Sequence, residues 1–273
     1  MMTMSRNTML LGGAVALGAA AYLWLRRTRQ LMTVKTLHSK AVVGVAAARH
    51  VASEIRKIVD DKGAARIIFA TGASQFEFIS ELVKLPVPWD SVTAFHLDEY
   101  VGIGEDHPAS FRKYLRERLF SQLKPSCKAV HYLDPADLTT YANLLREADI
   151  DLACIGIGEN GHIAFNDPPV ADFNDPLLVK RVELDDACRK QQLGEGWFPS
   201  MAAVPTHAIT LTVPAIMRSA RISCVVPDER KADAVYNTLH GPLSTACPAS
   251  ILRTHPSCVL WLDAASASRL RAI

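Results

Sequence analysis

The chain has 273 residues, of which 49% are hydrophobic and 21% charged, and its formal net charge at pH 7 is +2. A length of this order fits one large α/β domain, and the composition supplies enough apolar side chains for a sizeable core. A net charge so close to zero lacks the electrostatic footprint of a nucleic-acid-binding protein, so we expect no nucleic-acid partner.

The first part of the chain, residues 1–31, differs from the rest. Residues 8–25 are uncharged and mostly apolar, and the basic cluster 26–29 follows directly. About 18 apolar residues is the lower limit for a membrane-spanning helix, and basic residues behind it stay on the cytoplasmic side. Three interpretations stay open: a membrane anchor, translation that begins at Met32, or a targeting peptide. The first two place residues 32–273, which we expect to form the functional domain, in the cytoplasm.

Beyond this segment, short apolar runs alternate with stretches of helical spacing. In chain order, the expected helices are 40–59, 75–83, 108–123, 137–148, 185–192, 214–219, 229–239 and 264–271. The expected strands are 66–70, 91–97, 129–133, 151–157, 177–184, 207–213, 220–226 and 258–263. This alternation predicts βαβ units in one α/β domain with an open, mostly parallel sheet flanked by helices. The Pro-rich segment 167–176 is too long for a tight connection, and we expect it to act as a lid.

The cysteines show no Cys-x-x-Cys spacing. Three of the six, Cys154, Cys224 and Cys258, lie inside apolar strand-like runs. We interpret them as buried free thiols in a reducing compartment.

A turn of small residues, Thr71-Gly72-Ala73-Ser74, connects strand 66–70 to the helix that follows. In a strand–turn–helix unit of this kind, the free backbone N–H groups at the start of the helix bind phosphate. Ser74 adds a hydroxyl, although serine before a helix also serves as a simple N-cap. We expect a phosphate cradle at this turn and keep the N-cap as the alternative.

Polar side chains follow two other strands. Asp98 and Glu99 come after strand 91–97, and the loop behind strand 151–157 carries His162 and Asp167. Ligands bind beyond the carboxyl ends of parallel strands. An imidazole held by a carboxylate is suited to proton transfer, and a separate carboxylate can remove a proton from carbon next to a carbonyl.

Plainer interpretations exist for each group. Asp98 and Glu99 together are typical of a solvated turn, a lone loop histidine is usually structural, and Lys231 sits in a charge run typical of a wet helix end. A metal site at His162 and Asp167 lacks a third ligand at metal-binding spacing, so we expect no metal.

Two sequence blocks carry a specific resemblance. Residues 158–168 read Gly-Glu-Asn-Gly-His-Ile-Ala-Phe-Asn-Asp-Pro, and residues 95–102 read Phe-His-Leu-Asp-Glu-Tyr-Val-Gly, followed by His-Pro-Ala-Ser-Phe at 107–111. These blocks resemble the signature of the glucosamine-6-phosphate deaminase (isomerase) family. The resemblance covers the chain from about Met32 to the C-terminus. The resemblance implies a Rossmann-like sheet, no organic cofactor, and the conversion of glucosamine 6-phosphate and water to fructose 6-phosphate and ammonia.

The resemblance also implies catalytic roles. Asp98 would move the proton from carbon 2 to carbon 1, His162 would open the pyranose ring, and Asp167 would be the acid partner of His162. Many members have Asp where this chain has Asn160, and well-studied members often have Glu in place of Asp167. Because the side chain of Asp167 is one methylene shorter, its loop must lie closer to His162.

The substrate phosphate would bind at the turn 71–74 and at Lys231. The family's phosphate-binding arginine aligns with Gln192, and we take Arg189 as its replacement, with Lys190 as the alternative. The surrounding segment, Cys188 to Phe198, looks like a feature of a subgroup.

Two other functions are weighed. A 6-phosphogluconolactonase shares the fold, but that family usually follows its Gly-His with Ala-Ser-Leu-Phe-Pro rather than the Ile-Ala-Phe-Asn-Asp-Pro found here. A catalytically silent sugar-phosphate sensor at a membrane is the third hypothesis. Members of the family are often oligomers, so a homo-oligomer is an open expectation.

Overall fold

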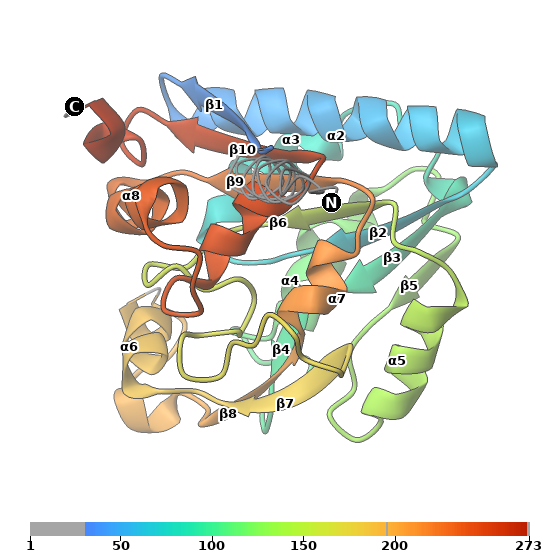
Figure 1. Cartoon of the computed structure of the whole chain (residues 1–273). Coiled ribbons are helices and arrows are strands. Elements are labelled where there is room, and N and C mark those ends of the chain that lie inside the picture. Colours follow the sequence, from blue (N-terminus) through green and yellow to red (C-terminus); the bar gives the residue numbers. More distant parts are fainter. Residues whose placement is uncertain (1–30, 195, 272–273) are drawn as a thin grey trace, which may run out of the picture.

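The computed structural model of the chain describes residues 31–194 and 196–271 (Figure 1). The segment 8–25, for which a membrane anchor was weighed, lies outside these residues. Within the two described ranges, no helix has both the length and the apolarity needed to cross a membrane.

A parallel sheet of seven strands forms the centre of the fold, in the order β1-β10-β9-β6-β2-β3-β5. Its strands are β1 (Thr33–Leu37), β2 (Ala65–Phe69), β3 (Val92–His96), β5 (Ala129–His131), β6 (Leu152–Ile155), β9 (Ile222–Val226) and β10 (Cys258–Asp263). The predicted α/β class and mostly parallel sheet are confirmed. The edge strand β1, at the start of the described chain, was not predicted.

Helices cover both faces of this sheet (Figure 1). One face packs against α2 (Lys40–Lys62), α3 (Phe76–Leu82) and α4 (Phe111–Arg118), and the other against α5 (Leu138–Glu147), α7 (Val213–Met217) and α8 (Ala232–His240). Strand β2 shows why two layers are needed: Ile67 and Phe69 belong to the first core and Ile68 to the second. Parallel strands are buried on both faces, so they appear in the sequence as continuous apolar runs.

Local signals set the limits of the longest helix. The Ser39 hydroxyl caps α2, and Gly63 ends it with φ 77°. Val43, Val51 and Ile55 on its inner face are completely buried, and burying a side chain of this size contributes about 1.5–3 kcal/mol. A side chain at Gly44 would lie 2.6 Å from Glu77 Cβ, so glycine allows α2 and α3 to pack closely.

A second, antiparallel sheet lies below the first and has the order β4-β8-β7 (Figure 1). It consists of β4 (Asp98–Tyr100), β7 (Val179–Glu183) and β8 (His207–Leu211), and α6 (Asp186–Gly194) packs against it. The last two strands were predicted, but the second, antiparallel sheet that they form with β4 was not. Strand β7 buries only Val179 and Val182, and burial of one face is typical of antiparallel sheets.

Several boundaries also differ. The predicted helix 264–271 is a set of turns followed by a short 3-10 helix, because the Asp263 carboxylate accepts the Ser266 backbone N–H at 2.8 Å and closes a turn. The predicted helix 108–123 begins only after its N-cap, Ser110. The 3-10 helices are η1 (Ala73–Gln75), η2 (Trp89–Ser91), η3 (Phe120–Gln122), η4 (Met201–Ala203), η5 (Glu229–Lys231), η6 (Pro248–Thr254) and η7 (Ser268–Arg271).

All six cysteines are free thiols. Cys154, Cys188, Cys224 and Cys258 are buried, whereas Cys127 and Cys247 are partly buried. The expectation of buried free thiols is confirmed for the three strand cysteines.

Candidate active site

A cavity of about 300 Å³ opens beyond the carboxyl ends of four adjacent strands, β9, β6, β2 and β3. Its walls include residues from the segments that follow these strands: 70–74, 97–98, 156–158 and 227–231. The chain runs outward from β2 to β3 and β5 and then returns to β6 on the other side of β2. A reversal of this kind leaves a crevice at the sheet edge, which is where open α/β sheets bind their ligands.

The turn after β2 forms one wall. Thr71, Gly72, Ala73 and Ser74 all line the cavity, and Gly72 has φ 93°, a conformation that favours glycine. The structure therefore brings the whole predicted cradle to the cavity.

Ser74 does not serve as an N-cap, because it lies inside η1 and neither η1 nor α3 has a side-chain cap. Its Oγ instead accepts a hydrogen bond from Gln75 Nε2 at 3.1 Å, and the same amide reaches the Val225 carbonyl at 3.3 Å. Gln75 is only 1% exposed, so the orientation of its side-chain amide is fixed. Because the Ser74 oxygen accepts from Gln75, the hydroxyl proton can be donated into the cavity.

Cationic side chains reach the cavity from the turn after β9. Lys231 lines the cavity and is only 8% exposed, so the wet-helix-end interpretation is wrong. Arg230, which the sequence did not single out, also lines it. Asp228 adopts φ 90° and its backbone N–H donates to Asp263 Oδ1 at 3.2 Å, which fixes the course of the turn.

His162 lines the cavity and is held from behind. Its Nδ1 lies 2.8 Å from Asp167 Oδ1, and the Asn160 amide donates to the same oxygen at 2.8 Å. The side-chain oxygen of Asn160, Oδ1, in turn accepts the His162 backbone N–H at 3.0 Å. A side chain at Gly158 would lie 2.2 Å from the imidazole ring, so only glycine leaves room for it.

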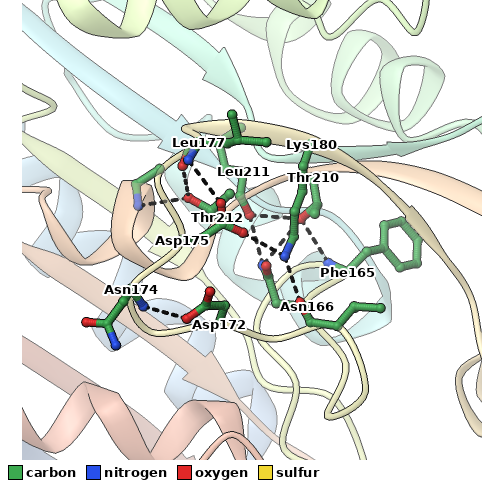
Figure 2. A network of polar contacts seen from close by, with 12 residues as sticks. Phe165, Asn166, Asp172, Asn174, Asp175, Leu177, Lys180, Thr210, Leu211 and Thr212 are labelled. Atoms are coloured by element: carbon green, nitrogen blue, oxygen red, sulfur yellow. Dashed lines mark hydrogen bonds and ion pairs between the residues drawn. The ribbon is translucent and has the colours of Figure 1, made fainter.

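The loop behind His162 is shaped by two unusual backbone positions and one buried amide. Gly161 has φ 86° and Ala164 has φ 52°. Asn166 is completely buried, and its Nδ2 donates to the carbonyl oxygens of Ile163 at 2.9 Å and Leu211 at 2.8 Å. Figure 2 shows how Asn166 joins the loop to strand β8.

The predicted lid segment, 167–176, continues from this loop and is held in place by the network in Figure 2. Lys180 Nζ lies 2.8 Å from Asp175 Oδ2 and donates to the Val170 carbonyl at 2.6 Å, and the Thr212 hydroxyl donates to the Leu177 carbonyl at 2.7 Å. No described residue of this segment lines the cavity. Its role as a lid stays a prediction.

Asp98 lines the cavity from the first position of β4. It is 6% exposed, and within the described part of the chain no group donates a hydrogen bond to its carboxylate. Burial, followed by the neighbouring charges of Glu99 and Asp167, raises the pKa of Asp98 well above its ordinary value.

Glu99 is also 6% exposed, so the solvated-turn interpretation of this pair is wrong. Its carboxylate accepts the backbone N–H of Arg112 at 2.8 Å and of Phe111 at 3.1 Å, and the Ser110 hydroxyl at 3.0 Å. A carboxylate at this position binds the free N–H groups at the start of α4. Glu99 therefore anchors the strand that presents Asp98.

Asp167 responds differently to a similar degree of burial. Desolvation alone would raise its pKa, but the charge of His162 and hydrogen bonds from His162, Asn160 and the Cys188 thiol outweigh it. The pKa of Asp167 therefore lies below its ordinary value. Asp167 stays ionised and holds the imidazole of His162 in one orientation.

Similarity to known proteins decides the family of the chain. The family model described as glucosamine-6-phosphate isomerases/6-phosphogluconolactonase matches residues 38–179. A glucosamine-6-phosphate deaminase of Listeria innocua is 36% identical over 207 residues, which cover 74% of this chain and 86% of the relative. The chain belongs to the glucosamine-6-phosphate isomerase/6-phosphogluconolactonase family.

One solved structure supports the same assignment, and a second one shares the fold. A monomeric glucosamine-6-phosphate deaminase superposes with a TM-score of 0.78 at 29% identity and covers 87% of this chain and 99% of its own. A 6-phosphogluconolactonase of Thermotoga maritima shares the fold, with a TM-score of 0.69 at 20% identity, covering 85% of this chain and 99% of its own.

Two residues beside His162 differ from the usual family pattern, and the structure explains how they fit together. The shorter side chain of Asp167 still reaches His162, at 2.8 Å. Asn160 donates to the Asp167 carboxylate, which an ionised aspartate at position 160 could not do. The asparagine and the shorter acid therefore fit one another.

The predicted phosphate contact of Arg189 is not supported by its position. Its guanidinium donates to the carbonyl oxygens of Met201 at 2.7 Å and Val204 at 3.1 Å. Neither Arg189 nor Lys190 lines the cavity, whereas Gln191 and Gln192 do. Helix α6 thus presents amides, not cations, at the site.

Sequence reasoning missed several other residues of the cavity wall. Lys40, at the start of α2, and Arg230 line it, and Gln75 supports the cradle from behind. The signal for Arg230 was its position beside Lys231. Among residues 31–194 and 196–271, no group of three His, Cys, Asp or Glu side chains is arranged to hold a metal ion.

Proposed function

We propose that the chain converts glucosamine 6-phosphate and water to fructose 6-phosphate and ammonia. The observation that carries the proposal is a single cavity lined by Asp98, His162, the small-residue turn 71–74 and Lys231. Relatives named glucosamine-6-phosphate deaminase, such as the Listeria innocua protein, support it.

In this proposal, His162 opens the sugar ring. Its Nδ1 faces Asp167, so Nε2 is the nitrogen left for the substrate. Protonated Nε2 donates a proton to the ring oxygen, the bond between carbon 1 and the ring oxygen breaks, and the carbon 1 hydroxyl releases its proton to water as the open-chain aldehyde forms. The ionised Asp167 stabilises the positive charge on the imidazole before this transfer.

Asp98 then performs the isomerisation. Its carboxylate removes the proton from carbon 2 and returns it to carbon 1, while a proton passes from the amine to the carbon 1 oxygen. The amino aldose thereby becomes the imine of a ketose. Water adds to the carbon–nitrogen double bond, and ammonia leaves as the ketone forms. A carboxylate with a raised pKa is a stronger base than an ordinary aspartate.

The far end of the substrate is held as an anion. Ser74 can donate its hydroxyl proton, the turn 71–74 offers backbone N–H groups, and Lys231 supplies positive charge. Binding of a phosphate remote from the reacting carbons positions them, and part of that binding energy lowers the reaction barrier.

The test is a product assay. Purified protein is given glucosamine 6-phosphate while ammonia and fructose 6-phosphate are measured, and equal amounts of the two are expected. Release of acid from 6-phosphogluconolactone, without ammonia from the amino sugar, would replace the proposal by the lactonase. Binding of glucosamine 6-phosphate without any product would replace it by the silent sensor.

We further propose that residues 32–273 contain the whole catalytic unit and that this unit works on the cytoplasmic side. The basic cluster 26–29 behind the apolar run 8–25 supports that orientation. The variant that begins at Met32 should match the full chain in kcat/KM. Membrane fractionation and N-terminal sequencing of the expressed protein separate an anchor from a start at Met32, and light scattering reports whether it forms a homo-oligomer.

A further inference from the structure

Two adjacent glutamines of α6 are oriented by protein donors. The Tyr100 hydroxyl donates to Gln192 Oε1 at 2.5 Å, and the Glu159 backbone N–H donates to Gln191 Oε1 at 3.0 Å. A carboxamide whose oxygen accepts in this way has its NH2 group left as a donor. Both glutamines line the cavity, and no described protein group accepts from either NH2. These N–H groups are therefore available to a ligand.

Glu159 connects these amides to the cationic turn. Its backbone holds Gln191, and its carboxylate lies 3.4 Å from Arg230 Nη1. This distance is longer than the roughly 2.7–2.9 Å of a tight charge-assisted hydrogen bond. Arg230 Nε also lies 3.4 Å from Asp228 Oδ1, so Arg230 lines the cavity in loose ion pairs with two carboxylates, beside Lys231, which is buried there.

We propose that this end of the cavity binds the substrate phosphate with two kinds of donor: positive charge from Arg230 and Lys231, and neutral N–H groups from Gln191 and Gln192. Arg230 then supplies the guanidinium that α6 lacks. The phosphate as ligand rests on the proposed function, whereas the assignment of an anion-binding end rests on the positions of these residues.

Binding measurements test the inference without turnover. Inorganic phosphate and fructose 6-phosphate are titrated into the full chain by calorimetry. Arg230→Gln is expected to weaken both at least about tenfold, the usual scale for a lost charge-assisted hydrogen bond. Gln192→Glu is expected to weaken both by a similar factor, because it replaces two donors with a negative charge.

A charge relocation makes the test stricter. Adding Gln192→Arg to the Arg230→Gln variant should restore most of the lost phosphate affinity, since it returns a guanidinium to the same end of the cavity. Lys190→Gln is the matched control on α6: it lowers the charge by one unit at an exposed position outside the cavity wall. Its affinity for phosphate should stay within twofold of the unmodified chain.

Tyr100→Phe tests whether the Tyr100 hydroxyl orients the Gln192 amide for the ligand or only stabilises the fold. Loss of the phenol hydroxyl should raise KM for glucosamine 6-phosphate severalfold and leave kcat nearly unchanged. A lower Tm without this split between KM and kcat would count against the inference.

Two further results would overturn it. One is phosphate affinity in Arg230→Gln and Gln192→Glu equal to that of Lys190→Gln. The other is an equal loss of affinity for unphosphorylated glucosamine, which would place the amides at the sugar. Failure of the ammonia assay with intact phosphate binding would remove the proposed function and leave the anion site standing.

Discussion

Two buried aspartates of the same site have opposite electrostatic environments. Asp98 is 6% exposed and Asp167 1% exposed, yet the pKa of Asp98 is raised and that of Asp167 is lowered. Asp98 has acidic neighbours and no hydrogen-bond donor among the described residues, whereas Asp167 has an imidazole, an amide and a thiol around it. Burial alone therefore does not decide the role of a carboxylate, because the donors around it do.

The largest effect is expected for Asp98→Asn. The amide cannot remove the carbon 2 proton, so kcat should fall by about 10²–10⁴-fold while substrate binding stays nearly intact. Because the raised pKa makes the ionised carboxylate unfavourable in the folded state at neutral pH, the variant should also be more stable. An increase in Tm of about 2–4 °C corresponds to about 1 kcal/mol in a domain of this size.

Hydrogen exchange at carbon 2 in deuterated water and thermal unfolding check both statements. Unmodified exchange in this variant would show that another base operates. A lower Tm would contradict the raised pKa.

His162→Gln tests the other side of the comparison. A glutamine cannot donate a proton to the ring oxygen as an imidazolium does, so turnover of cyclic substrate should fall by about 10²-fold or more. An open-chain phosphorylated substrate needs no ring opening and should recover part of the loss. Steady-state kinetics with both kinds of substrate decide the matter, and an equal loss for both would remove the ring-opening role.

Asp167→Asn should differ from Asp98→Asn in the sign of its effect on stability. A lowered pKa contributes stability above the ordinary pKa of the carboxyl, and that contribution is lost as the pH falls through the lowered value. At neutral pH the variant should therefore lose about 1–3 kcal/mol, the usual cost of leaving buried partners unsatisfied. Thermal unfolding of the two variants side by side gives the result: opposite changes in Tm are expected, and changes of the same sign would contradict the comparison.

The pH dependence of activity sharpens the same contrast. Asp98 must be ionised to act as a base, so kcat/KM should fall about tenfold per pH unit below its raised pKa. The acidic limb should therefore lie above the ordinary range for an aspartate. Asp167 contributes to this raised pKa through its charge, so Asp167→Asn should move the limb to lower pH. A limb that does not move would show that the two carboxylates are not coupled.

The sequence predicts the sheet edge of the site well. Apolar runs identify the parallel strands, and the turn 71–74, Asp98 and His162 meet because the carboxyl ends of neighbouring strands lie at one edge. The apolar periodicity of strands and helices is a local signal, so it is readable without the fold.

Local sequence signals do not predict the pairing of the second sheet or the direction of the side chains on α6. Strand β4 pairs with β8 across more than a hundred residues, and nothing local marks that pairing. We expected Arg189 to replace the family's phosphate-binding arginine. Its guanidinium instead donates to the carbonyl oxygens of Met201 and Val204, which follow α6 in the chain, and so it does not reach the cavity. Such tertiary acceptors cannot be read from a helical pattern.

The contact of Cys188 with Asp167 is another tertiary contact that the sequence does not reveal. Its removal gives the smallest of the expected effects on activity. The Cys188 thiol is completely buried and neighbours the Asp167 carboxylate, so we expect it to position the carboxylate that holds His162. Cys188→Ala should lower kcat by about twofold to fivefold, on the scale of one weak hydrogen bond, and shift the pH profile of kcat. Cys188→Ser, which keeps a donor, should recover most of the loss. Cys258→Ala removes a buried thiol at the first residue of β10, which does not line the cavity, and is the matched control. If Ala and Ser variants at position 188 behaved alike, and like that control, the thiol would only fill space.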